Sequence, residues 1–152
     1  DAGDADSGVA PHITLVGPGI VPLLTIDEVG AHVSSVAATT APFEITLQGV
    51  DTFRPVTDVV FVSLTSGAAE CAALEARLRS GPFRVPAEFD YHPHVTIAAD
   101  LPDEKLDAAA AAAASFTATF TACELAVFDY RQQRGWVKVG VLPLGTPVTP
   151  SM

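Results

Sequence analysis

The sequence predicts a mixed fold of β-strands and α-helices, organised as two similar lobes within a single domain of 152 residues. Apolar and polar residues alternate strictly at 43–48 and again at 116–121, which indicates half-buried strands. Apolar residues recur at helical spacing over 68–79, which indicates an amphipathic helix. The order of a His-x-Thr strand, a helix, an alternating strand and a further strand occurs twice, and this repetition predicts the two lobes.

The first half begins with a strand over 11–15, which the Gly-Pro-Gly sequence at 17–19 closes. A helix is expected to start at Thr25, because this hydroxyl and the Glu28 carboxylate three residues later match a capping box. The helix should fade before Pro42. Strands over 43–48 and 58–64 and the helix over 68–79 complete this half.

The second half repeats the order of the first. Its elements are a strand at 94–98, a helix that starts at 102–104, an alternating strand at 116–121, a segment at 124–129 that extends or pairs with that strand, and a final strand at 135–141. An alanine run occupies 108–114. Because alanine has the highest helix propensity, this run predicts a packed helix.

The predicted lobes divide the domain, residues 1–152, unequally. One lobe comprises approximately 9–50 with 135–145, and the other approximately 51–130. A strand and a helix at 58–79 precede the second His-x-Thr string, whereas nothing comparable precedes the first. We therefore hypothesise that an N-terminal strand and helix are missing from the first lobe.

The composition limits the classes of partner. With 49% hydrophobic and 17% charged residues, the chain is expected to fold around a sizeable core. Eight Lys and Arg residues stand against eighteen Asp and Glu residues, for a net charge of −10. A broad basic surface for duplex nucleic acid is therefore excluded. A small nucleotide or an RNA end, held in a local pocket, is the expected partner.

The chain carries no signal for a membrane or for a disulfide framework. No apolar stretch approaches the ~20 residues of a membrane span, and two distant cysteines, Cys71 and Cys123, favour a reduced protein. We therefore expect a cytoplasmic protein that has no membrane partner. The oligomeric state is not predicted.

Two short strings carry the chemical signal, at His12–Leu15 and His94–Ile97. In each, a histidine and a threonine are separated by one apolar residue, so on a strand the imidazole and the hydroxyl emerge on the same face. Two such strands facing each other would hold two imidazoles and two hydroxyls around one small cleft. Such a site can move two protons around a phosphate.

Cleaving a phosphodiester without a metal requires a base for the attacking oxygen and an acid for the leaving oxygen. Histidine suits both roles, because its ordinary pKa of about 6.5 allows one ring to be neutral while the other is charged. Threonine hydroxyls can donate hydrogen bonds to the non-bridging phosphate oxygens. The chain therefore predicts acid–base chemistry at a phosphate, with no cofactor and no metal.

The segments Val9–Leu15 and His92–Ile97, each with a proline before the motif histidine, resemble the 2H phosphoesterase superfamily. Within it they resemble the bacterial 2′-5′ RNA ligase-like proteins and cyclic phosphodiesterases, over roughly 9–144. The resemblance implies a two-lobed, pseudo-symmetric α+β fold, with antiparallel sheets lining a central cleft and helices outside. It also implies hydrolysis of a 2′,3′-cyclic phosphate, or of a 2′-5′ linked or cyclic nucleotide, without metal.

Position by position, the resemblance makes His12 and His94 the catalytic pair and Thr14 and Thr96 the phosphate-binding hydroxyls. It casts His12 as the general acid and His94 as the general base, although the sequence by itself leaves the order open. Many relatives carry an aromatic residue just after the first motif, where this chain has the sequence 16–19. Substrate contacts are therefore sought elsewhere, and the candidates are Phe89, Tyr91, Tyr130, Arg131, Arg134 and Trp136.

Alternative interpretations stay open at this point. The chain could bind a nucleotide or an RNA end without turning it over. It could also be a metal-dependent hydrolase that uses His92 and His94, with Asp90 or His12 completing the ligands. We expect instead that His92 is peripheral and that His32 faces solvent. The basic stretch at 130–134 could line the site, but the alternative is a solvated hairpin.

Overall fold

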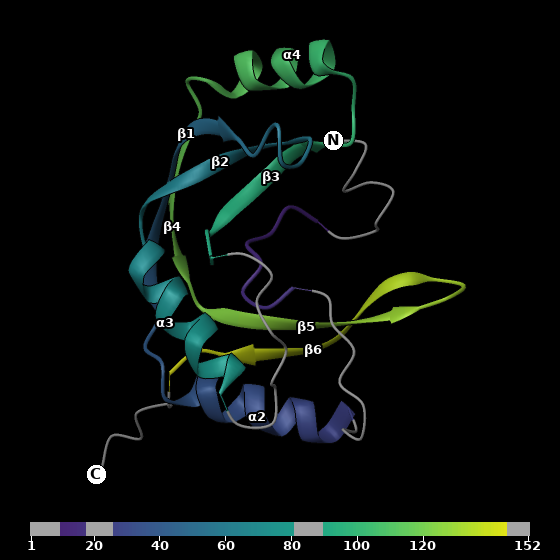
Figure 1. The fold of residues 1–152 in the computed structure, drawn as a ribbon. Coiled ribbons are helices and arrows are strands. Elements are labelled where there is room, and N and C mark those ends of the chain that lie inside the picture. Colours follow the sequence, from purple (N-terminus) through teal and green to yellow (C-terminus); the bar gives the residue numbers. More distant parts are fainter. Residues whose placement is uncertain (1–9, 18–25, 81–89, 146–152) are drawn as a thin grey trace.

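The computed structural model of the protein describes residues 10–17, 26–80 and 90–145 (Figure 1). Within these ranges the elements are α2 (Ile26–Ala38), β1 (Phe43–Thr52), β2 (Val59–Ser66), α3 (Ala68–Arg79), β3 (His94–Ala99), α4 (Asp103–Ala113), β4 (Thr117–Ala122), β5 (Glu124–Arg131) and β6 (Gly135–Pro143). Every pair of neighbouring strands is antiparallel. The predicted α+β class is confirmed.

The strands form two sheets of unequal size. The larger sheet has the order β3-β2-β1-β4, and the smaller is the β5–β6 hairpin. A single residue, Cys123, separates β4 from β5, so the chain passes directly from one sheet to the other. The segment at 124–129 was expected to extend the strand before it or to pair with it. It belongs to β5, which follows β4 along the chain and pairs with β6.

The observed pairing divides the chain differently from the predicted lobes. Strand β1, which was placed in the first lobe, pairs with β2 and β4 of the second. Strand β5, which was placed in the second lobe, pairs with β6. The element types were predicted from local periodicity, which contains no information about the partner of a strand. Pairing is decided by contacts between residues far apart in the sequence.

Helices cover the outer faces of both sheets. Helix α2 lies along the β5–β6 hairpin (Figure 1), where Val29, Val33 and Val36 pack with Leu125 and Leu144. Helix α3 buries the predicted helical stripe, consisting of Cys71, Leu74 and Leu78. Helix α4 includes most of the alanine run and inserts the fully buried Leu106 beside Val60 and Ala98. No helix of the described ranges is long and apolar enough to cross a membrane.

Candidate active site

The two His-x-Thr strings lie side by side. Ile13 pairs with Val95 of β3 in an isolated antiparallel bridge, which sets the segment 10–17 beside the edge of the larger sheet (Figure 1). The predicted strand over 11–15 is thus reduced to one bridge, and Pro11, which has no amide hydrogen, cannot add a ladder bond at its N-terminal end. Both bridging side chains pack against one core cluster, whose buried members are Ile45, Leu47, Val62 and Cys71.

The bridge determines where the four motif side chains point. Residues that flank a paired position face each other across the strands. His12 therefore lies opposite Thr96, and Thr14 lies opposite His94. Because side chains alternate along a strand and the two bridging residues face the core, all four polar side chains share the other face. The structure thus brings together the two imidazoles and two hydroxyls that the sequence nominated.

Both histidines make the same local hydrogen bond. Nδ1 of His12 donates to the carbonyl of Ala10 at 2.8 Å, and Nδ1 of His94 donates to the carbonyl of His92 at 2.6 Å. In each case a proline lies between the partners, and its fixed φ favours this tight geometry. A carbonyl can only accept, so Nδ1 carries the hydrogen and Nε2 is the ring nitrogen that can accept a proton.

The ring of His94 lies against two phenyl rings. Its centroid is 5.0 Å from that of Phe53 and 5.1 Å from that of Phe61. Burial lowers the pKa of His94 below its ordinary value of 6.5, and the neighbouring His92 and His12 lower it further, while the bond to the His92 carbonyl opposes them. The neutral imidazole, the form that can accept a proton, is therefore favoured near neutral pH.

Tyr91, which the sequence nominated as a substrate contact, makes a structural hydrogen bond within the chain. Its hydroxyl donates to the backbone carbonyl of Thr14 at 2.8 Å, so it ties the approach to β3 to the first motif. Burial raises the pKa of Tyr91, which keeps the hydroxyl protonated and able to donate. We therefore assign Tyr91 to holding the two strings together. Phe89, nominated with it, lies outside the described residues.

The other nominated contacts lie at the far end of the β5–β6 hairpin (Figure 1). Tyr130 pairs with Trp136 across the hairpin, and their rings meet in a T-shape with centroids 5.3 Å apart. Arg131 forms an ion pair with Asp129 at 3.5 Å, and the amide of Arg134 donates to the carbonyl of Arg131. These contacts stay within the hairpin, so a role in substrate binding remains a prediction.

The profile of the 2'-5' RNA ligase superfamily matches residues 2–134 of the chain. The chain belongs to this superfamily. The match confirms the resemblance drawn from the motif strings.

Two curated relatives are similar to this chain over part of their own length. A "Putative phosphoesterase" of Halalkalibacterium halodurans is 29% identical over 98 residues, which are 64% of this chain and 57% of the relative. One of Oceanobacillus iheyensis is 30% identical over 93 residues, which are 61% of this chain and 54% of the relative. The aligned part thus spans little more than half of each relative.

Two solved structures have a similar fold. A crystal structure of a Thermus thermophilus protein superposes with a TM-score of 0.63 at 19% identity, covering 88% of this chain and 78% of that one. A crystal structure described as a phosphoesterase superposes with a TM-score of 0.58 at 18% identity, covering 89% and 77%. At this level of identity the likeness concerns the fold alone.

In the part of the chain that the structure describes, no further ligands lie near His92 and His94 to support the metal-site alternative. There, no three His, Cys, Asp or Glu side chains lie close enough to hold a metal ion together. His92, expected to be peripheral, is an exposed residue whose ring packs against Phe53 and Phe61, with centroids 5.6 Å and 5.1 Å away. His32 was expected in solvent, but Nε2 of this half-buried residue bonds to the carbonyl of Leu78.

Sequence reasoning missed the two phenylalanines that contact His94. Phe61 was placed on a strand, but nothing indicated that its face was the motif face. In the structure it lies directly opposite Thr96 in the β2–β3 ladder. Phe53 follows β1, outside the strands, where no periodic pattern applies. Only the pairing of the strands brings these rings to the motif.

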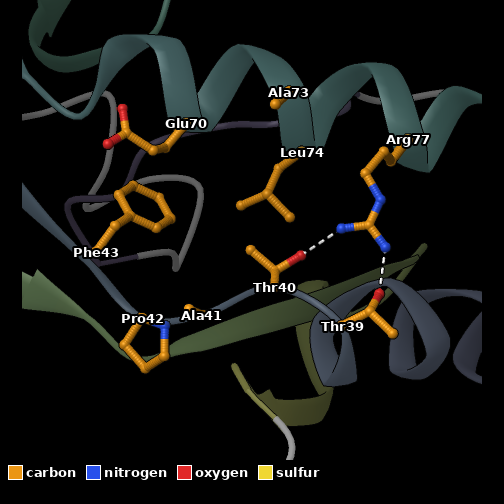
Figure 2. A pocket seen from close by; sticks show the side chains of 9 residues that line it. All are labelled: Thr39, Thr40, Ala41, Pro42, Phe43, Glu70, Ala73, Leu74 and Arg77. Carbon is orange, nitrogen blue, oxygen red and sulfur yellow. Dashed lines mark hydrogen bonds between the residues drawn. The ribbon is translucent and has the colours of Figure 1, made fainter.

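A hollow of about 360 Å³ lies away from the motif strings, between α3 and the end of α2 (Figure 2). Arg77 donates there to the hydroxyls of Thr39 and Thr40, the latter at 2.6 Å. The same hydroxyls donate to carbonyls in the last turn of α2. A cation is favourable at a helix C-terminus. We therefore interpret the residues around this hollow as a structural contact between α3 and the end of α2.

Proposed function

We propose that the protein is a metal-independent phosphodiesterase that hydrolyses a 2′,3′-cyclic phosphate, or a 2′-5′ linked or cyclic nucleotide. The observation that supports the proposal is the Ile13–Val95 bridge, which His12 and Thr14 flank on one strand and His94 and Thr96 on the other. Membership of the 2'-5' RNA ligase superfamily and the phosphoesterase names of the relatives support the same class of reaction.

In the proposed reaction, His94 is the general base. Its lowered pKa favours the neutral ring, so Nε2 takes a proton from the attacking water as the new bond to phosphorus forms. Protonated His12 delivers a proton to the oxygen that leaves as one ester bond breaks. The hydroxyls of Thr14 and Thr96 donate to the non-bridging oxygens, where negative charge accumulates in the transition state. The product is a phosphomonoester.

The proposed substrate is small. A net charge of −10 repels a long polyanion, and only a local site can hold a phosphate against it. We therefore propose a nucleotide or an RNA end as the substrate.

A panel of substrates tests the proposal. Purified protein receives 2′,3′-cyclic nucleotides and short 2′-5′ linked oligonucleotides, with and without a chelator. We expect turnover that the chelator does not change. Activity that the chelator abolishes would instead support the metal-dependent alternative with His92 and His94. Tight binding without turnover would support a nucleotide-binding module.

The acid limb of the pH–rate profile is expected to lie below pH 6.5. Protonation of His94 removes the base, and because the pKa of His94 is lowered, that protonation requires a more acidic solution than an ordinary histidine does. The measurement is kcat/KM as a function of pH, which reports the free enzyme. A limb centred at or above 6.5 would contradict the assignment of His94 as the base.

A further inference from the structure

Four rings form a cluster on the motif face. Phe53 and Phe61 are stacked, with centroids 4.2 Å apart and planes 29° apart. The imidazole of His94 meets the ring of Phe53 almost perpendicularly, at 84°, and the ring of Phe61 at 56°. The ring of His92 lies 6.0 Å from that of His94 and contacts the same two phenyl rings. The phenyl pair is thus the surface on which the imidazole of His94 rests.

The phenyl pair restrains the orientation of the His94 ring, which the hydrogen bond of Nδ1 alone does not fix. The bond from Nδ1 of His94 to the His92 carbonyl fixes one atom of the ring, but the ring can still pivot about that atom. Packing against two phenyl rings opposes the pivot and so determines where Nε2 points. General-base catalysis is sensitive to such placement, because a displacement of about 1 Å can lower the rate about 100-fold.

The two phenylalanines are held by different means. Phe61 belongs to a central strand of the larger sheet, pairs with Thr96 and is only 2% exposed. Phe53 lies in the connection 53–58 between β1 and β2 and is half-buried. Its backbone amide donates to the carbonyl of Val59 at 3.0 Å. Phe53 therefore depends on the anchoring of its loop.

The neighbouring Arg54 adds further contacts that anchor this loop. Its backbone amide and its Nε both donate to the hydroxyl of Thr52 at 3.1 Å. Its two terminal nitrogens reach α4, donating to Asp103 at 3.3 Å and to Asp107 at 2.9 Å. The guanidinium thus joins the end of β1 to the first turns of α4. The loop that carries Phe53 is held from both sides.

We propose that Phe53 is a positioning residue for His94, held in place by the Arg54 contacts to α4. This proposal rests on the proposed function, in which His94 is the base. Phe53 touches no substrate in it and acts through the imidazole alone. The titratable neighbours that act on His94 are His92 and His12, and the substitutions below change neither.

The test compares Phe53→Leu, which keeps an apolar side chain and removes the ring, with Phe53→Tyr, which keeps the ring. Val56→Ala, at a residue of the same loop that is 71% exposed, is the matched control. We expect Phe53→Leu to lower kcat by about 10- to 100-fold and KM to change less. Phe53→Tyr and Val56→Ala should retain kcat.

A second readout does not depend on turnover. In an NMR titration, Phe53→Leu should raise the pKa of His94 toward 6.5, because removal of the ring exposes the imidazole to water. Arg54→Gln should shift the same resonance in the same direction, and it provides the test if Phe53→Leu does not fold. If these variants lower only the melting temperature and leave kcat and the titration of His94 unchanged, the positioning role is overturned.

The two proposals can fail separately. Absence of turnover by the unmodified protein on every substrate would count against the phosphodiesterase, while the titration of His94 would still show whether Phe53 controls the imidazole. Normal turnover with an unaltered His94 in Phe53→Leu would remove the positioning role and leave the phosphodiesterase intact.

Discussion

Replacing His94 with alanine is expected to lower kcat by about 10²- to 10⁴-fold, the range typical for the loss of a general acid or base. His12→Ala should have an effect in the same range, because the leaving oxygen then lacks its proton donor. The measurement is turnover of the best substrate from the panel, with each variant checked for folding by circular dichroism. Both histidines lie on one face across the Ile13–Val95 bridge.

The double variant sharpens this prediction. Residues that act as a unit in one transition state are not additive, so His12→Ala with His94→Ala should cost much less than the product of the single effects. His32→Ala is the matched control, because this histidine lies in α2 and bonds to the carbonyl of Leu78. If either motif variant turned over substrate at the unmodified rate, the acid–base proposal would be wrong.

Replacing Thr14 or Thr96 with valine is expected to lower kcat by about 10²- to 10³-fold, as for the removal of one donor to a developing oxyanion. Valine keeps a branched side chain of similar shape but has no hydroxyl, so the position can stay folded while the bond to phosphate is lost. The effect should fall on kcat more than on KM, because charge on the non-bridging oxygens is greatest in the transition state.

The control for the threonines comes from the larger sheet itself. Thr121 is exposed on β4, at the opposite edge of the sheet from β3. Thr121→Val makes the same chemical change away from the motif strings, so it should leave kcat unchanged. Equal losses in Thr121→Val and Thr96→Val would indicate a general loss of structure and would refute the phosphate-binding role.

Local periodicity was sufficient to predict most elements of the fold. The alternation at 43–48 corresponds to β1, the helical spacing at 68–79 corresponds to α3, and the alanine run lies largely within α4. Each of these patterns reflects one face of one element against the core. The strand at 11–15 was overpredicted: a single bridge forms at Ile13, and Pro11 at its start cannot donate to a ladder.

The grouping of elements could not be predicted from the same patterns. Strands β1 and β5 each pair with strands that had been assigned to the other predicted lobe. Strands with similar alternation are compatible with several partners, so the alternation does not select one. The aromatic surface behind His94 depends on that grouping, because Phe61 reaches the motif only through the β2–β3 ladder. The contact of Tyr91 with Thr14 joins residues 77 positions apart and leaves no local signal.

The sequence by itself determined which side chains belong together within each string: a histidine and a threonine two residues apart share a face of any extended chain. Only the tertiary structure decided that the two strings are neighbours and that one imidazole is packed against phenyl rings. The physical reason is the separation along the sequence between the residues that interact. Alternation of side chains is a property of the local backbone, whereas the bridge between Ile13 and Val95 brings together two half-buried side chains that pack against one core cluster.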